Sequence, residues 1–407
     1  MANALAKDLE LMFENFVVGY DAQCVVSKEC DHVSTDPQTM QRAGDVFYQR
    51  QDYMASVVTG LDLSVAARTD VLQRMVPTSF RSPDNVIFEL DAKELRDDEI
   101  KSGMGKAAAL RLSAEVDKNI YSTVGLQAGI VIKTTAALSW EDAQQAEAML
   151  LSRGASNPNR KLFLNPFDYK AIAKELGNKA YMGDRSKDAY ERSMVPDIAT
   201  FATFRTDNVY NLAVTGTVSG TTINGNQSFT PSAMTGDVPT DNRRMTLTVQ
   251  GANVANTKVG DAFTIVGVNA CHMLDKSDTG QLMTFRIVGG AGTTSLTITP
   301  AIISSGPYQN VTAQAANSAA LVFLNTATKP VNPFWVQGAV SLAYGKLAFP
   351  SGQGVQVMQA TTDQGVPLIM SYGFDHITAK VTVRFTTLYA TTVLQPGMTG
   401  VILANQS

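Results

Sequence analysis

Apolar residues recur at helical spacing in the first half of the chain. Between residues 93 and 127 they return at about every fourth position, at Met104, Ala108, Leu112, Val116, Ile120 and Val124, and Leu110, Ala114 and Tyr121 widen the stripe. A stripe with this period is typical of an amphipathic helix. We therefore predict one long helix over residues 93–127, with the acidic segment LRDDE near its N-terminus, where negative charge is favourable.

Two shorter helices are predicted from residues that cap helix ends. In SWEDAQQAEAMLLSRG, Ser139 stands at the N-cap position and Asp142 three residues later, as in a capping box. In NPFDYKAIAKELG, Asn165 is the expected N-cap, Pro166 the first helical residue and Gly177 the terminator. With the short apolar run KLFL between them, the first half indicates an α+β protein.

The N-terminal segment MANALAKDLELMFENF predicts a further amphipathic helix, with one apolar face made by Leu5, Leu9, Met12 and Phe16. This segment lacks the apolar stretch and cleavage site of a secretory signal. No later run approaches the eighteen or so apolar residues of a membrane span. We therefore expect a protein made in a cytoplasm, with no membrane partner and with reduced cysteines. An apolar face of this kind indicates only that something covers it.

Short strands dominate the second half of the chain. Runs such as RMTLTVQG, DAFTIVGV, LMTFRIVGG and SLTITP follow one another at intervals of about ten residues, with Gly, Asn and Asp turns between them. This spacing is typical of an antiparallel sandwich or barrel. After residue 328 the character is mixed again, so we predict a β module over residues 213–328, inserted between the parts of another domain and able to fold by itself.

Residues 46–90 form a different kind of segment. Strand-like runs alternate apolar with polar and charged residues, and the turn SPDN leads into VIFEL. Such a segment could hardly fill a core alone. We therefore predict an extended hairpin that lies on another surface.

Charged residues are distributed very unevenly. Residues 1–210 hold 54 of the 70 Asp, Glu, Lys and Arg residues, and no Glu follows Glu191. The net charge is only −4, which gives no global attraction to nucleic acid or to acidic membranes. The two halves of the chain are therefore chemically different, and neither indicates a basic binding surface.

The segment CVVSKECDH is the first candidate for metal or thiol chemistry. On a strand, Cys24 and Cys30 would lie about 20 Å apart, and on a helix they would leave on different faces. Only a loop could bring them together with His32, and the spacing differs from that of zinc sites. Buried or incidental thiols are the preferred interpretation, so we predict no metal and no cofactor.

The second candidate is NACHMLDKSDTG, in which Cys271 and His272 could act as nucleophile and base with Asp275 or Asp278. Adjacent residues on a strand point to opposite faces, which separates the two side chains. His376, in FDHITAK, is expected to begin a strand as a half-exposed structural residue. The chain contains no complete phosphate loop, dinucleotide fingerprint or nucleophile elbow, although GMGKAAA has part of the first. We therefore predict that the protein is not an enzyme.

The order of these segments resembles the major capsid proteins of tailed bacteriophages, with the Hong Kong 97-type fold. More closely, the chain resembles the coat proteins of short-tailed enterobacterial phages that carry an inserted β domain, such as Salmonella-phage-like coat proteins. The likeness lies in MQR at 40–42, PDN at 83–85, LRDD at 95–98, LNPFDYKAIAKEL at 164–176, TDNRRMTLTV at 240–249 and NPFW at 332–335. LNPFDYK is the most specific of these.

The resemblance implies a major capsid protein that self-assembles into hexamers and pentamers of an icosahedral head enclosing double-stranded DNA, without sequence-specific binding. It implies a scaffolding protein and a portal protein as partners, assembly in the host cytoplasm and a place in the virion. The implied domains are an N-terminal arm (1–45), an extended loop (46–92), a spine helix (93–129), peripheral and axial domains (130–212 and 329–407) and the insertion domain (213–328).

The family also implies salt bridges between capsomers, made by a loop of the insertion domain. The matching segment is MTGDVPTDNRR, so the candidates for these contacts are Asp237, Asp241, Arg243 and Arg244. An ordinary polar hairpin, in which exposed pairs contribute at most about 1 kcal/mol, is the alternative interpretation.

The founding phage of the fold cross-links its shell through a lysine of the extended loop. Here no lysine occurs between Lys28 and Lys93, so we expect a shell held without covalent bonds. The main alternative function is a phage or bacterial surface-binding protein whose module 213–328 is an immunoglobulin-like ligand-binding sandwich. The long charged hairpin and the spine helix favour the capsid protein.

Overall fold

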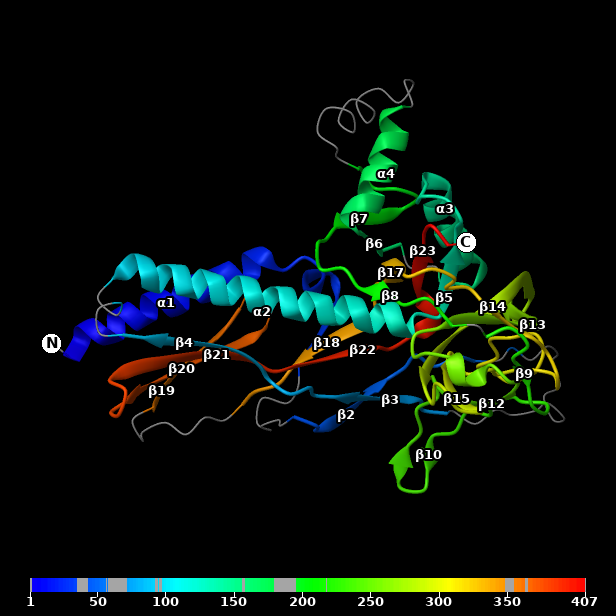
Figure 1. Ribbon diagram of the computed structural model, residues 1–407. Coiled ribbons are helices and arrows are strands. Elements are labelled where there is room, and N and C mark those ends of the chain that lie inside the picture. The colour runs from blue at the N-terminus through cyan, green and yellow to red at the C-terminus, as the bar shows by residue number, and fades with distance from the viewer. Residues whose placement is uncertain are drawn as a thin grey trace. The chain divides into compact units, whose positions relative to one another are not determined.

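Figure 1 shows a computed structural model of the chain, which describes residues 2–34, 43–55, 57, 72–91, 94, 97–155, 158–178, 195–216, 218–347, 355–362 and 365–406. It divides into two compact units. The first contains Met1–Phe47, Thr78–Ile120 and Ser341–Thr392, and the second contains Tyr48–Pro77, Tyr121–Val340 and Val393–Ser407. The α-helices lie in the first half of the chain, and after residue 177 the described residues contain strands and short 3₁₀ helices, which confirms the predicted α+β class.

Two helices of the first unit lie along each other, α1 (Ala2–Gln23) and α2 (Asp98–Gln127), of which α2 continues into the second unit. The apolar face of α1 is completely buried at Leu9, Met12, Phe16 and Tyr20, whereas the side chain of Leu5 lies outside the described residues. Gly105 of α2 faces the backbone of Met12 so closely that no Cβ would fit between them. The cover for this helix therefore comes from its own subunit.

The long predicted helix is confirmed, with Asp98 as its first residue. Ala108, Leu112, Val116 and Ile120 are buried, as the four-residue spacing predicts. The prediction that Leu110 widens this stripe is wrong, because Leu110 is 56% exposed. At 100° per residue it lies about 200° from both Ala108 and Leu112, on the opposite face.

Asp117 on α2 fixes the chain that leaves α1. Its carboxylate accepts hydrogen bonds from the backbone N–H groups of Val25 and Ser27 at 2.9 Å and of Val26 at 3.1 Å. These residues lead into the short 3₁₀ helix η1 (Ser27–Glu29). Burial raises the pKa of Asp117, although the three hydrogen bonds act against this shift.

The first unit also contains two sheets. One is antiparallel, in the order β19 (Val355–Thr361), β20 (Pro367–Asp375), β21 (Lys380–Thr387) and β4 (Asp84–Leu90). In the other, β1 (Asp31–Ser34) pairs in parallel with β18 (Val340–Tyr344), and β22 (Tyr389–Val393) follows. The run VIFEL thus lies at the edge of a sheet, where β4 pairs with β21 in full register.

The second unit is built on a sheet in the order β5 (Ile130–Lys133), β23 (Thr399–Leu403), β17 (Lys329–Val336), β6 (Arg160–Leu164) and β7 (Phe201–Arg205), with β8 (Asn211–Leu212) on β17. The short helix η4 (Pro396–Met398) precedes β23. Helices α3 (Trp140–Ser152) and α4 (Pro166–Gly177) bury Leu150 and Ile172 in the same core.

The predicted helix caps are confirmed. Ser139 and Asp142 form a reciprocal capping box at the start of α3. Asn165 caps α4, and Pro166 is its first residue. Helix α4 includes Gly177 and is capped at its C-terminus by Asn178, one residue later than the sequence predicts.

A sheet with its own core occupies residues 222–323 of the second unit. Its order is β16 (Leu321–Phe323), β13 (Ala262–Cys271), β14 (Asp278–Gly289), β15 (Ser295–Thr299), β12 (Met245–Gln250) and β9 (Thr222–Ile223), and η3 (Val254–Asn256) follows β12. The buried cluster extends from Ile223 to Leu321. All the pairings along this order are antiparallel, as expected from the strand spacing.

Two further pairs of strands are separate from these sheets. The strands β2 (Val46–Arg50) and β3 (Met75–Ser79) pair with each other, and so do β10 (Met234–Thr235) and β11 (Val238–Pro239). The antiparallel pairing of β2 with β3 extends from Asp45 with Phe80 to Gln51 with Arg74. Most of the segment that joins β2 to β3, residues 58–71, lies outside the described residues.

Candidate assembly interface

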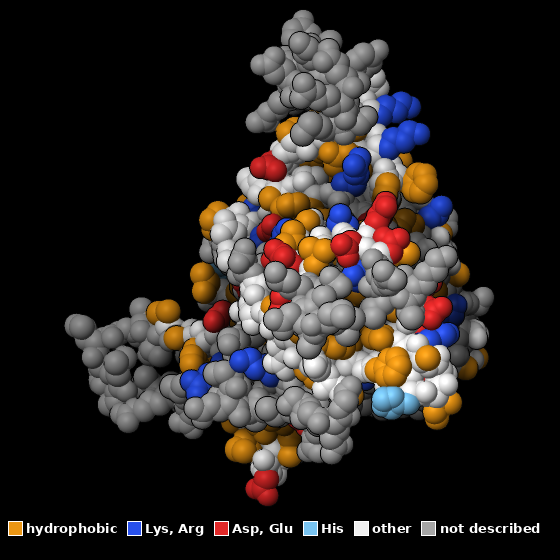
Figure 2. Space-filling view, turned by 90° about the vertical axis from the view of Figure 1, so that its left-hand side faces the viewer, with side chains coloured by type: hydrophobic (Ala, Val, Ile, Leu, Met, Phe, Trp, Pro, Cys, Tyr) orange, Lys and Arg blue, Asp and Glu red, His pale blue; other side chains and the backbone are white. Residues whose placement is uncertain are grey.

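The hairpin β10–β11 projects from the sheet of residues 222–323 (Figure 1). Met234 is 55% and Val238 58% exposed, and Asp237 is exposed between them. Gly236 turns the chain in the left-handed region, at φ +63°. In the space-filling view the lowest projection has hydrophobic side chains and an acidic one (Figure 2). The side chains of Met234 and Val238 are therefore not part of the core of the isolated subunit.

Asn242 fastens the base of this hairpin. Its side-chain oxygen accepts a hydrogen bond from the Ser232 N–H at 2.9 Å, and its side-chain NH₂ donates to the carbonyls of Ser232 at 2.9 Å and Thr240 at 3.1 Å. The hydroxyl of Thr240 is 2.7 Å from that of Thr235. Because Asn242 is only 3% exposed, these bonds are shielded from water and hold both legs of the hairpin together.

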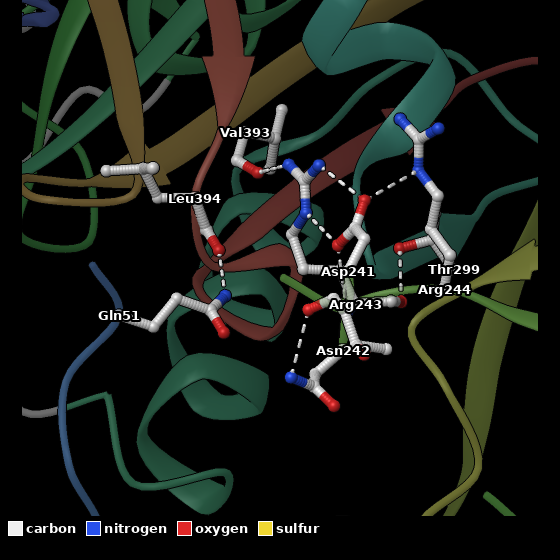
Figure 3. Close-up of polar contacts among 9 residues, drawn as sticks. Gln51, Asp241, Asn242, Arg243, Arg244, Thr299, Val393 and Leu394 are labelled. Carbon is white, nitrogen blue, oxygen red and sulfur yellow. Dashed lines mark hydrogen bonds and ion pairs between the residues drawn. The ribbon is translucent and has the colours of Figure 1, made fainter. Parts of the chain in front are cut away.

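Asp241 and Arg243 form a second brace at the same base (Figure 3). Arg243 donates from Nε and Nη2 to the two oxygens of Asp241, both at 2.8 Å. Its Nη1 donates to the carbonyl of Val393, and its own carbonyl accepts from the Thr299 hydroxyl at 3.2 Å. A guanidinium that grips a carboxylate with two parallel bonds is geometrically specific. The pair fixes the hairpin to two other segments of the unit.

The buried charges of Asp241 and Arg243 neutralise each other within the subunit. Burial alone would raise the pKa of Asp241, but the hydrogen bonds and positive charge of Arg243, with the charge of Arg244, lower it below its usual value. The side chain of Arg243 is 4% exposed and that of Asp241 18%, whereas that of Arg244 is 38% exposed and its Nε lies 3.6 Å from Asp241. The guanidinium of Arg244 therefore remains partly accessible to solvent.

The four residues expected at contacts between capsomers thus lie in two different environments. Asp237 at the turn and Arg244 beside the base present charge to solvent. Asp241 and Arg243 are neighbours of theirs but hold each other inside the subunit. Contact of any of the four with another copy stays a prediction.

A second cluster, which sequence reasoning missed, surrounds the stem of the β2–β3 pair. We define the stem as Gln51–Met54 and Leu72–Met75. The Tyr308 hydroxyl donates to the Leu72 carbonyl at 2.9 Å, and the Arg74 guanidinium lies 3.9 Å above the centre of the Tyr308 ring. Because Tyr308 lies 236 positions from Leu72, no local spacing could have pointed to this contact.

The cysteines of CVVSKECDH are structural in their surroundings. Cys24 is 4% and Cys30 7% exposed, whereas His32 is exposed. Burial raises the pKa of the Cys24 thiol to about 12, so it stays protonated at neutral pH. Among the described residues, no group of three or more His, Cys, Asp and Glu side chains has the arrangement of a metal site.

Cys271 and His272 also lie in separate environments. Cys271 is 3% exposed at the end of β13, and its Sγ accepts a long hydrogen bond from the Gln309 side-chain amide at 3.8 Å. Burial raises the pKa of the Cys271 thiol. His272 is instead 3.0 Å from Asp275 in the following turn. The structure therefore gives Cys271 neither the activating base nor the thiolate that a nucleophile needs.

Comparison with known proteins assigns the family. The family described as "P22 coat protein - gene protein 5" matches residues 1–404, so the chain belongs to the P22 coat protein family. Among solved structures, it is similar to a protein of Mycobacterium phage Che8 (11% identity, TM-score 0.44, covering 89% of this chain and 86% of that one). It is also similar to the mature capsid of bacteriophage PhiM1 (9% identity, TM-score 0.45, covering 94% and 87%).

Part of the chain is similar to the coat protein I-domain of CUS-3, with 38% identity and a TM-score of 0.21, covering 27% of this chain and 99% of that one. Family membership confirms the expected capsid fold of the Hong Kong 97 type and the function: the protein is a major capsid protein of an icosahedral phage head, a component of the virion that associates with copies of itself. Within the described residues, none of the helices is both long and apolar enough to cross a membrane.

Proposed function

We propose that copies of this chain form the hexamers and pentamers of the head and that the hairpin β10–β11 connects neighbouring capsomers. The observation that carries this proposal is the combination of a firmly braced base with an exposed apolar tip. Asn242, Asp241 and Arg243 fix the direction of the hairpin. Met234 and Val238 then lie on a rigid projection, which lowers the entropy cost of contact with another copy.

The exposed charges give this contact its orientation. Asp237 and Arg244 bear opposite charge and remain accessible, so two hairpins related by a two-fold axis can each present an acid to the other's base. Asp241 and Arg243 take part from the base, where their pair aims the hairpin. A single exposed ion pair contributes at most about 1 kcal/mol, but its repetition at many junctions of a closed shell adds up.

The remaining expectations of the family complete the proposal. A scaffolding protein and a portal protein are partners during assembly, which takes place in the host cytoplasm, and the finished shell encloses double-stranded DNA without reading its sequence. The net charge of −4 supports containment rather than tight binding of DNA. We also propose a shell without covalent cross-links and a protein without catalytic activity or cofactor.

Assembly of purified subunits with the scaffolding protein, followed by light scattering and electron microscopy, tests the hairpin contact. We expect Val238→Ser, and Asp237→Lys with it, to reduce the yield of closed shells at least several-fold while the unassembled subunit keeps its thermal midpoint. Leu274→Ser is the matched control, because Leu274 is 74% exposed on another turn of the same unit. Normal shell yield from the hairpin variants, or equal loss from the control, would contradict the proposal.

A further inference from the structure

The stem of the β2–β3 pair is held by the sheet domain of residues 222–323 at several points. Met54 on the outgoing leg and Leu72 on the returning leg both pack against the core of that domain. Met75 forms a parallel bridge with Asp241, and Arg74 Nη2 donates to the Asp52 carbonyl at 3.2 Å across the stem. Both legs of the stem are therefore in contact with the sheet domain.

Residues after β22 hold the outgoing leg as well. Gln51 donates from its side chain to the Leu394 carbonyl (Figure 3), and Gln395 donates to the Asp52 carboxylate at 2.7 Å. Arg243 at the base of β10–β11 bonds to Val393, the last residue of β22, directly before this segment. One continuous set of contacts thus joins the base of β10–β11 and the stem of β2–β3.

A cavity of about 90 Å³ lies within this junction, lined among others by Gln51, Arg74, Arg153, Arg243 and Tyr308. The directed contacts of the stem border this cavity, and those to Tyr308 come from the sheet domain itself.

We infer that the sheet domain of residues 222–323 acts as a clamp that sets the direction of the β2–β3 stem, and that Tyr308 and Arg74 are positioning residues for capsid assembly. Tyr308 is 7% exposed in the loop after β15, so its ring is held by its surroundings, and the Arg74 guanidinium stacks on it. Its hydroxyl fixes the backbone at Leu72, two residues away. Together these contacts hold the returning leg both by its side chain and by its main chain.

This clamp gives the domain a role beyond the proposed contact of β10–β11. The resemblance to capsid proteins implies that the segment between the two legs contacts a neighbouring copy, and the direction of the stem would then decide where that contact is made. The sheet domain would therefore act in assembly within its own subunit, by aiming the β2–β3 pair.

Hydrogen exchange on unassembled, full-length subunits tests the clamp directly. Tyr308→Phe keeps the ring and removes one hydrogen bond, so we expect amides of residues 49–54 and 72–76 to exchange about fivefold faster. Arg74→Met keeps the apolar part of the side chain but removes its stacking on Tyr308 and its hydrogen bond to the opposite leg. We expect exchange in the stem to be about tenfold faster. Amides of β13 and β14 should exchange as in the unmodified protein.

The chain offers a matched control. The Tyr169 hydroxyl also bonds to the backbone, here as the acceptor from the Val195 N–H at 2.8 Å, and the Arg205 guanidinium lies 5.5 Å from its ring centre. Tyr169→Phe and Arg205→Met remove a comparable tyrosine–backbone bond and arginine–ring contact at another place, so they should leave exchange in the stem unchanged. Unchanged exchange in the stem of the Tyr308 and Arg74 variants would overturn the clamp.

Assembly of the same variants tests the positioning role. We expect Tyr308→Phe and Arg74→Met to give a higher fraction of irregular shells than the two controls, at an unchanged thermal midpoint of the subunit. Faster exchange in the stem together with normal shells would contradict this role. Val238→Ser should not alter exchange in the stem, so failure of the β10–β11 contact and failure of the clamp give different results.

Discussion

The two strand pairs β10–β11 and β2–β3 are held in different ways. The bonds that close β10–β11 on itself join residues no more than ten positions apart, such as Ser232 with Asn242 and Asp241 with Arg243, and Arg243 then fixes this base to the distant Val393 and Thr299. The stem of β2–β3 depends on Tyr308 and Leu394, which lie 236 and 343 positions from their partners. The first hairpin can therefore form with its own segment, whereas the direction of the second exists only after the sheet domain has folded.

Replacement of Arg243 should loosen the base of β10–β11 more than any other substitution, because Arg243 bonds to both Asp241 and Val393. Arg243→Met leaves the Asp241 carboxylate without its bidentate partner, and we expect a loss of about 3 kcal/mol in the free energy of local opening. Hydrogen exchange of residues 232–242 and of the β2–β3 stem measures it. Arg244→Met is the control, since its side chain is 38% exposed and 3.6 Å from Asp241. Equal effects of both substitutions would show that the buried brace is unimportant.

Replacement of Asn242 should affect only one of the two strand pairs, because its side chain bonds only within the β10–β11 segment. Asn242→Ala removes the bonds to Ser232 and Thr240, and we expect a loss of about 2 kcal/mol confined to the β10–β11 hairpin. Exchange in the β2–β3 stem should not change. Asn253→Ala, which removes one exposed bond to the Ser219 carbonyl, should have a much smaller effect. Loosening of the stem in Asn242→Ala would mean that Asn242 restrains the stem as well, beyond the contacts that Asp241 and Arg243 make.

Acid should weaken the β10–β11 base through Asp241. The pKa of Asp241 is lower in the folded protein than in the unfolded chain, so its contribution to stability is complete above the usual value of about 4 and disappears as the pH falls through the lowered pKa. We expect the urea midpoint of the subunit to fall between pH 5 and pH 3. Asp241→Asn should remove part of this fall, and an identical fall in that variant would assign the pH dependence to other carboxylates.

The smallest effect is expected at the exposed end of the stem. Gln395→Ala removes only the bond to the Asp52 carboxylate, and a surface contact of this kind is worth about 0.5 kcal/mol or less. Exchange of residues 49–54 should rise less than in Tyr308→Phe. A larger rise would place the main restraint on the outgoing leg rather than at Tyr308.

What could be predicted from the sequence follows the same division. The capping residues Ser139 and Asn165 signal their helices because each bonds to a backbone group within three positions. The buried stripe of α2 and the strands of the sheet domain follow from periodicity alone. The segment MTGDVPTDNRR could be singled out from its resemblance to a family, because the residues that shape its hairpin lie beside one another.

The rest depends on contacts that no local pattern encodes. Arg243 reads in sequence as a surface charge, yet it is 5% exposed, because Asp241 and the distant Val393 carbonyl satisfy its guanidinium. Tyr308 reads as a loop aromatic, and only the folded chain brings it to Leu72. Likewise, the burial of Phe16 depends on its packing against Phe385, at 4.6 Å between ring centres.

The most direct test of the account is to compare hydrogen exchange of residues 233–240 in unassembled subunits and in assembled shells. If β10–β11 connects capsomers, amides of Met234 to Val238 exchange at least tenfold more slowly in the shell, because a neighbouring copy covers them. If these amides exchange at the same rate in both states, the hairpin remains in contact with solvent after assembly, and its proposed role as the link between capsomers is wrong.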